Sequence, residues 1–158
     1  MTCAVFALEN WQTRDRFQVL KRALGRHMMT DPISDMIIRI KNAAMAGNDV
    51  VSMPQSKIKV AIADKLKQRG VVSDIASRGK NVGKTLELTL ARDEKGTYKF
   101  IDVRRVSKPG CRVYFSAHDI RPIMGGTGTL LISTPKGILF GHEARQEGVG
   151  GEPLFEIW

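Results

Sequence analysis

The sequence predicts an α+β protein in which helices occupy the first half of the chain and short strands dominate the second half. Segments 31–47 and 56–70 repeat apolar residues at the three- and four-residue spacing of amphipathic helices, between capping residues. Beyond residue 103, turns rich in glycine and hydroxyl side chains separate short apolar or alternating runs, as between strands. The length of 158 residues suits one compact unit or two small lobes.

The charge balance favours a polyanionic partner. The chain carries 25 basic and 16 acidic side chains, a formal net charge of +9. A strongly basic protein of this size more often meets nucleic acid than a membrane surface or no special partner. The hydrophobic fraction of 42% is slightly low but still allows a core of ordinary size.

Several functional classes find no support in the sequence. Cys3 and Cys111 form no Cys-x-x-Cys pair and are expected to be reduced thiols of a cytosolic protein. The three histidines show no metal-ligand spacing, and no apolar run reaches the ~18–20 residues of a membrane span. Neither a Gly-x-Ser-x-Gly elbow nor a His-Glu-x-x-His helix occurs. We therefore expect no enzyme, no cofactor, no metal and no small-molecule substrate.

A helix is predicted to begin at Asp31-Pro32. Aspartate suits the N-cap and proline the first helical position, and Gly47 ends the pattern. One face is apolar, formed by Ile33, Met36, Ile37 and Ile40. Arg39 lies near the far end of this helix.

A short strand, 50–53, ends at Pro54 and precedes a second helix. Ser56 is the predicted N-cap, the helix spans Lys57–Arg69, and Gly70 closes it. One side of this helix is basic, and its lysines and arginine are expected to form a solvated face: Lys57, Lys59, Lys65, Lys67 and Arg69.

Four further strands are predicted before residue 116. Segments 71–77 and 85–92 flank a basic loop, and the second alternates leucines with polar residues. Segment 100–107 alternates as well, and Lys108-Pro109-Gly110 makes a turn into a strand over 111–115. In that last strand Arg112 and Tyr114 share one face. Tyr114 is then either a core residue with a satisfied hydroxyl or an exposed binding residue.

The stretch from Thr129 to Trp158 holds the most informative turns. A buried strand over 130–132 leads into the turn 133–137, a short polar helix is predicted over 141–147, and a last strand over 153–158 follows the glycine-rich turn 148–152. Glycines let a foreign backbone come close, and hydroxyl and N–H groups bind phosphates and 2′-hydroxyls. The glycines at 125–128 lack the spacing of a phosphate-binding P-loop.

The ordered motifs resemble the small-subunit ribosomal protein eight family over about residues 29–158. Segments 31–42 and 105–114 are similar to its N-terminal and middle signatures. Pro135 replaces a serine found in many members and removes one hydroxyl contact. The matches to its C-terminal signature are Ser133, Thr134, Gly137, Ala144, Arg145, Gly148, Gly150, Gly151 and Glu152.

The resemblance implies a two-lobed α+β fold. Residues 29–103 would form an α/β lobe with helices on a small antiparallel sheet, and residues 104–158 a mostly β, rRNA-binding lobe with a short helix. Residues 1–28 would be an extension, with Phe17, Leu20 and Leu24 at helical spacing. Either the true start is Met28 or Met29 and the extension is non-native or a poorly ordered tail, or it is a real arm that touches rRNA.

The resemblance also implies the function. It predicts a structural constituent of the cytoplasmic small ribosomal subunit, rather than of an organellar ribosome, that binds the central domain of 16S rRNA and helps to assemble the platform. Expected partners are 16S-type rRNA, neighbouring small-subunit proteins and its own mRNA; the alternative is a free RNA-binding translational repressor. Candidate RNA-binding residues are Ser133, Thr134, Lys136, Gly137, Gly150, Gly151, Glu152, Tyr114, Arg112, Lys108, Lys57 and Arg39.

The expected role of Glu152 is open, because a carboxylate is an unusual choice beside RNA. It could orient Ser133 or a neighbouring N–H group, accept from a base amino group, or only cap its turn.

Overall fold

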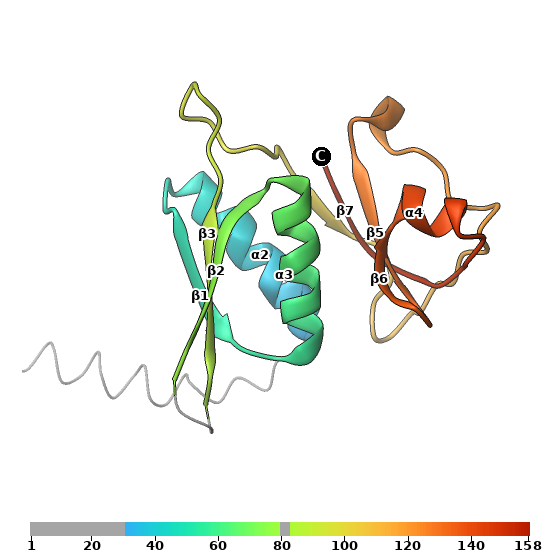
Figure 1. Cartoon of the computed structure of the whole chain (residues 1–158), viewed down its shortest axis with the longest axis horizontal. Coiled ribbons are helices and arrows are strands. Elements are labelled where there is room, and N and C mark those ends of the chain that lie inside the picture. The colour runs from blue at the N-terminus through green and yellow to red at the C-terminus, as the bar shows by residue number, and fades with distance from the viewer. Residues whose placement is uncertain (1–30, 80–82) are drawn as a thin grey trace, which may run out of the picture. The chain divides into compact units, whose positions relative to one another are not determined.

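The computed structural model describes residues 31–79 and 83–158, and the region Asp31–Trp158 is one compact unit (Figure 1). The helix predicted around Phe17, Leu20 and Leu24 and the alternatives for residues 1–28 lie outside the described residues. The predicted lobe boundary near residue 103 stays a prediction.

Helix α2 (Pro32–Met45) begins as its sequence predicts. The Asp31 carboxylate accepts hydrogen bonds from the N–H groups of Ile33 and Ser34, at 3.0 and 3.2 Å, which satisfies donors that the first helical turn leaves unpaired. The buried face consists of the four predicted residues, Ile33, Met36, Ile37 and Ile40.

Helix α3 (Lys57–Arg69) is capped by Ser56 and ends at Gly70, whose φ of 81° requires the left-handed region. The expectation of a solvated basic face is wrong for Lys59, which is only 4% exposed. Its ammonium lies 3.8 Å from the Asp35 carboxylate, and burial lowers its pKa. Lys65 is also engaged, at 2.8 Å from Glu143 of a later helix.

The first sheet has the order β1-β3-β2 and is antiparallel throughout, with β1 (Val50–Pro54), β2 (Val72–Arg78) and β3 (Thr85–Leu90). The leucines of β3 alternate inward, as predicted, and are buried beneath the helices. Figure 1 shows α2 and α3 on one face of this sheet.

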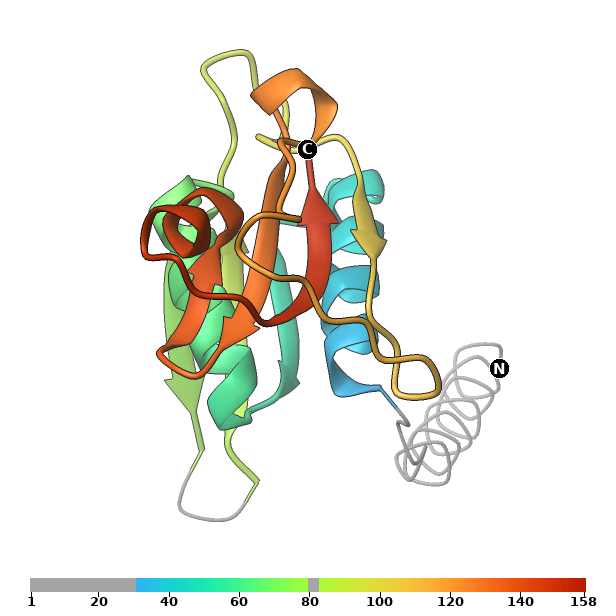
Figure 2. The same cartoon turned by 90° about the vertical axis from the view of Figure 1, so that its right-hand side faces the viewer.

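The second sheet has the order β4-β7-β5-β6 and is also antiparallel. Its strands are β4 (Val103–Arg105), β5 (Thr129–Thr134), β6 (Gly137–Phe140) and β7 (Glu152–Ile157). A 3₁₀ turn, η1 (Met124–Gly126), precedes β5, and α4 (Gly141–Gln146) links β6 to the last turn. Figure 2 views this sheet with α2 and α3 behind it.

Two strand predictions in this half are corrected. The strand expected over 100–107 is reduced to β4, and segment 111–115 forms no strand. In place of that strand, two isolated bridges hold the segment, Lys108 to Cys111 and Phe115 to Gly151. The alternation of apolar and polar residues therefore predicted longer strands than the structure has. Neither segment pairs with a neighbouring strand along its whole length. In addition, β6 was not predicted.

One face of the second sheet continues the main core. Leu131, Phe155 and Ile157 join the same buried cluster as the inner residues of α2, α3 and the first sheet. Leu130 and Ile132, on the other face, form a smaller core with Ile120 and Ala144. The α+β prediction, with N-terminal helices and a C-terminal β region, is confirmed.

Candidate nucleic-acid interface

The predicted turn after β5 is the tip of a tight hairpin. Thr134 ends β5 and pairs with Gly137, which begins β6, so only Pro135 and Lys136 form the loop. The Thr134 hydroxyl donates to the Gly137 carbonyl at 2.8 Å and is almost buried. Gly137 has a φ of 121°, open only to glycine without strain, and nothing occupies the space where its side chain would stand.

Ser133 lies one residue before this tip, opposite Ile138 of β6 and Glu152 of β7. It is half-buried, and the part of the chain that the structure describes offers its hydroxyl no hydrogen-bond partner. Of the two predicted hydroxyls, Ser133 is therefore the one whose donor is available to a ligand, whereas Thr134 uses its donor inside the hairpin.

Gly150 and Gly151 are required by the packing of the chain itself. A Cβ atom on Gly151 would lie 2.1 Å from the Ser133 carbonyl oxygen, and one on Gly150 would lie 2.5 Å from the carbonyl oxygen of Phe115. Phe115 and Gly151 also exchange two backbone hydrogen bonds, at 2.9 and 3.0 Å. The close backbone approach expected of these glycines is thus met internally, and their contact with RNA stays a prediction.

Glu152 holds the 107–113 loop to the start of β7. Its carboxylate accepts from the fully buried Ser107 hydroxyl and, at 2.8 Å, from the guanidinium of Arg112. Ser107 accepts in turn from the N–H group of Val113, at 3.4 Å. Ser133, the cross-strand neighbour of Glu152, makes no side-chain bond with it. Glu152 therefore does not orient Ser133, and it holds the 107–113 loop instead, a role that was not among those predicted.

That loop carries three predicted site residues to the surface. Lys108 and Cys111 close the turn by mutual backbone hydrogen bonds at 3.2 and 3.0 Å, and the Lys108 side chain is exposed. Tyr114 is 69% exposed, so the alternative of a core tyrosine is wrong. Arg112 is exposed although it is bound to Glu152.

Most of the predicted residues thus lie in segments that are connected by hydrogen bonds between strands or bridges. The Phe115–Gly151 bridge joins Tyr114 and its loop to the start of β7, which is paired with Ser133 and the hairpin tip. We call this region the hairpin surface, defined by Ser133, Lys136, Gly137, Lys108, Arg112 and Tyr114.

Two predicted residues lie on the helices instead. Lys57 is the exposed first residue of α3. Arg39 of α2 is bound to Asp35, at 2.7 Å, and reaches towards the Ser52 carbonyl. No contact within the described residues connects either side chain to the hairpin surface.

The cations of the hairpin surface are not all equally available. Lys136 pairs with Glu147 at 2.8 Å, with both side chains well exposed, so water screens this pair strongly. Arg112 pairs with the more buried Glu152. Lys108 has no ion pair within residues 31–79 and 83–158. Lys108 is therefore the cation that an incoming phosphate would meet with least competition.

Sequence reasoning missed Ser107, the residue that fixes Glu152. It lies within the middle motif, 105–114, but nothing in its spacing indicates a partner forty-five residues later.

Among the described residues no group of three or more His, Cys, Asp or Glu side chains could hold a metal ion. Within the same residues, no helix has the length and apolar character needed to cross a membrane.

Comparison with known proteins identifies the family of this chain. The family model described as ribosomal protein S8 matches residues 31–158. The small ribosomal subunit protein uS8 of Corynebacterium glutamicum strain R is 45% identical over 130 residues, which cover 82% of this chain and 98% of that protein. The uS8 protein of Nocardioides sp. is 45% identical over 133 residues, with the same shares covered.

Proposed function

Because the chain belongs to the ribosomal protein S8 family, and is thus a constituent of the small ribosomal subunit, we propose that it binds the central domain of 16S-type rRNA directly and helps to assemble the platform. The observation that carries this proposal is the hairpin surface. On this surface the Ser133 hydroxyl has no internal partner among the described residues, the space beside Gly137 is empty, and Tyr114 is exposed. Strand pairing connects these three residues through β7. Such groups suit a folded RNA, which proteins read through hydroxyls, phosphates and splayed bases.

In this proposal the protein acts as a rigid clamp. The Ser133 hydroxyl would meet a 2′-hydroxyl or a base edge, and Tyr114 would stack on an unpaired base. Lys108 and Lys136 would contact phosphates and release counterions. Glu152 would act indirectly, because it holds the loop of Lys108 and Tyr114 against β7 through Ser107. No step requires bond chemistry, so the proposed role is structural and not catalytic.

Lys57 and Arg39 would add a separate contact on the helices. Lys57 lies beside the exposed loop residues Gly83 and Lys84, around a shallow recess at the start of α3. Two lysines there would attract phosphate without reading sequence. Arg39 would have to release Asp35 or share it, and it should therefore contribute less than Lys57.

A second role as a repressor of its own mRNA needs only an RNA hairpin that presents the same groups as the rRNA site. No separate surface is required for it, because the hairpin surface would bind both. Competition between the rRNA hairpin and the mRNA for one protein molecule tests this role. Simultaneous binding of both RNAs would contradict it. In either role the protein would act in the cytoplasm, bound to the ribosome as a subunit constituent and free of it as a repressor.

Reconstitution tests the proposed function. Small-subunit particles are assembled from 16S-type rRNA and the other small-subunit proteins, with and without this chain, and the central domain is probed by hydroxyl radicals. The proposal predicts protected rRNA positions in the central domain that require this chain, and slower platform assembly without it. Protection elsewhere only, or unchanged assembly, would contradict it.

A further inference from the structure

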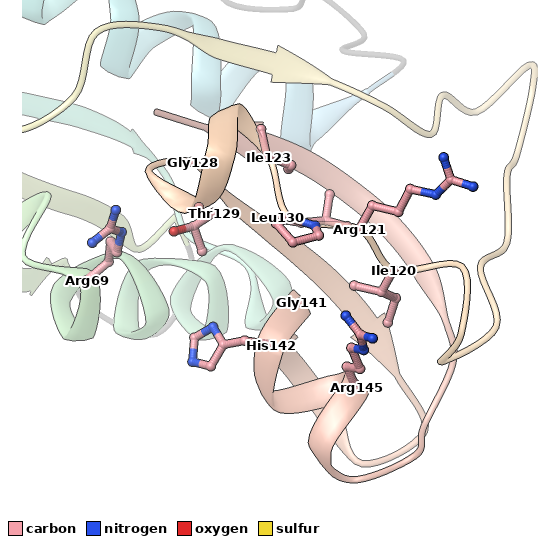
Figure 3. A pocket seen from close by; sticks show the side chains of 12 residues that line it. Arg69, Ile120, Arg121, Ile123, Gly128, Thr129, Leu130, Gly141, His142 and Arg145 are labelled. Atoms are coloured by element: carbon pink, nitrogen blue, oxygen red, sulfur yellow. The ribbon is translucent and has the colours of Figure 1, made fainter.

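A second recess lies at the other end of β5, away from the hairpin tip. This cavity, of about 360 Å³, is lined around the first residues of β5 and of α4 (Figure 3). Figure 3 shows Arg69 on one side and Arg145 on the other, with Thr129 and Leu130 between them. We call it the arginine cavity and define it by Arg69, Arg121, Arg145, Ile120, Ile123 and Leu130.

Tight packing holds the walls of the arginine cavity in place. A Cβ atom on Gly128 would lie 2.7 Å from the Ile123 side chain, and one on Gly141 would lie 3.2 Å from Ile120. Arg69 of α3 donates to the Thr127 carbonyl at 2.8 Å, which ties the helix to the turn before β5. The cavity is therefore a recess whose walls are held in place by packing and by the hydrogen bond from α3.

The charge of the cavity is unbalanced. None of its lining residues is acidic. In residues 31–79 and 83–158, Arg39, Arg78, Arg92, Arg105 and Arg112 each have a carboxylate partner. The described arginines without one are Arg69, Arg104, Arg121 and Arg145, and all but Arg104 line this cavity. The nearby Asp119 carboxylate forms its hydrogen bonds with Ser116, and it makes no ion pair with Arg121, although the charge of Arg121 helps to lower the Asp119 pKa.

These features favour a protein ligand over RNA. Guanidinium groups bind both carboxylates and phosphates in forked pairs. The floor, however, is formed by the branched aliphatic side chains of Ile120, Ile123 and Leu130, which suit an apolar protein side chain. His142, the ring at this cavity, is already stacked on Phe140, with centroids 5.5 Å apart. Duplex phosphates alone would need no apolar recess.

We propose that the arginine cavity receives an acidic segment of a neighbouring small-subunit protein, with one carboxylate on Arg145, a second on Arg121 and an adjacent apolar side chain on Ile123. Charge complementarity carries this choice, because two guanidiniums without an ion pair among the described residues gain most from incoming carboxylates. The inference rests on the proposed ribosomal role and adds to it a partner surface separate from the rRNA contacts.

Site-directed photo-crosslinking in assembled particles tests this inference. The full chain carries p-benzoylphenylalanine in place of His142, an exposed residue that lines the cavity, and small subunits that contain it are purified and irradiated. Lys95, exposed and outside the cavity, is the control position. The expected product is a crosslink from position 142 to a protein segment that contains two or more acidic residues beside an apolar one.

Charge removal supplies the second readout. The double variant Arg121→Ala/Arg145→Ala should lower the crosslink yield by about tenfold, as expected for lost hydrogen bonds to a charged group. Arg104→Ala, which removes an exposed arginine outside the cavity, should leave the yield unchanged.

Three results would overturn the inference: crosslinks to rRNA, crosslinks to a segment without acidic residues, or no crosslink from particles that contain the chain. The amount of chain in the particles is measured first. If the unsubstituted chain were missing from the particles, the proposed ribosomal function itself would fail. A chain that is present but does not crosslink as expected would overturn only the assignment of the cavity.

Discussion

The carboxylate of Glu152 accepts a hydrogen bond from the hydroxyl of Ser107, forty-five residues earlier in the chain. Ser107 is fully buried, and Glu152 starts the central strand β7. This contact fixes the loop that carries Lys108 and Tyr114 beside the strand that pairs with Ser133. The groups that we propose to bind RNA therefore depend for their position on the buried contact between Ser107 and Glu152.

Removal of this contact should destabilise the protein. Ser107→Ala leaves one lone pair of Glu152 without its donor, which should cost about 1–3 kcal/mol of unfolding free energy. Urea unfolding of the variant and the wild type measures the difference. Ser52→Ala, which alters an exposed serine with no side-chain hydrogen bond among the described residues, is the control and should cost less. Equal stabilities of wild type and Ser107→Ala would show that the contact is not formed in solution.

Removal of each of the two hairpin hydroxyls, on Ser133 and Thr134, should affect RNA binding and stability to different degrees. Ser133→Ala should weaken binding to the rRNA hairpin by several-fold to about a hundredfold, or 1–3 kcal/mol, with little change in stability. Thr134→Ala also removes the internal bond to Gly137 and should lower stability by about 1 kcal/mol. Binding isotherms and thermal unfolding of both variants test this difference. Wild-type affinity of Ser133→Ala would refute the assignment of Ser133.

Gly151 should not tolerate a side chain. A methyl group there would collide with the Ser133 backbone, so Gly151→Ala should lower the unfolding free energy by about 3 kcal/mol or more. Gly110→Ala is a matched control, because its new methyl group would meet open space. Denaturant unfolding compares the two variants. A mild loss at Gly151, similar to that at Gly110, would mean that β5 and β7 are not this close.

Acid should weaken the start of α2. Burial alone would raise the pKa of Asp31, but hydrogen bonds from Ser34 and the Arg105 guanidinium outweigh burial and hold its pKa below the ordinary value. A lowered pKa in the folded state stabilises the protein above the unfolded pKa of about 3.9, and this contribution is lost as the pH falls through the folded value.

The comparison of Asp31→Asn with the wild type measures this contribution. The variant should be less stable at pH 7, and the difference should shrink as the pH falls below about 4. Asp64→Asn, at an exposed position of α3, is the control. A difference between Asp31→Asn and the wild type that stays constant from pH 7 to pH 2 would contradict the role given to Asp31.

Local sequence patterns predicted the helices well, because caps and apolar spacing act within a few residues. Asp31, Ser56 and Gly70 fulfil the expected capping roles. Patterns failed where distant segments decide the structure. Segment 111–115 alternates like a strand but forms only isolated bridges, at Cys111 and Phe115. Lys59 is buried and lies 3.8 Å from Asp35 of the other helix.

The candidate site shows the same difference between local features, which were predicted, and contacts between distant segments, which were not. The turn after β5 was predicted, because its hydroxyls and Gly137 are neighbours in sequence, but the hairpin with β6 was not. The roles of Gly151 and Glu152 were not, because they depend on Ser133 and Ser107, which lie in other segments. A glycine needed for internal packing and one needed for RNA approach look alike in a sequence.

Salt-dependent binding to a central-domain rRNA hairpin tests the central claim most directly, beside a scrambled duplex of equal length. The wild type should prefer the hairpin by at least about tenfold near physiological salt, because hydrogen-bonded contacts survive screening. Lys108→Ala should reduce the salt slope by about one, whereas Lys95→Ala should leave it unchanged. Equal binding to both RNAs that collapses as salt rises would contradict specific recognition through the hairpin surface.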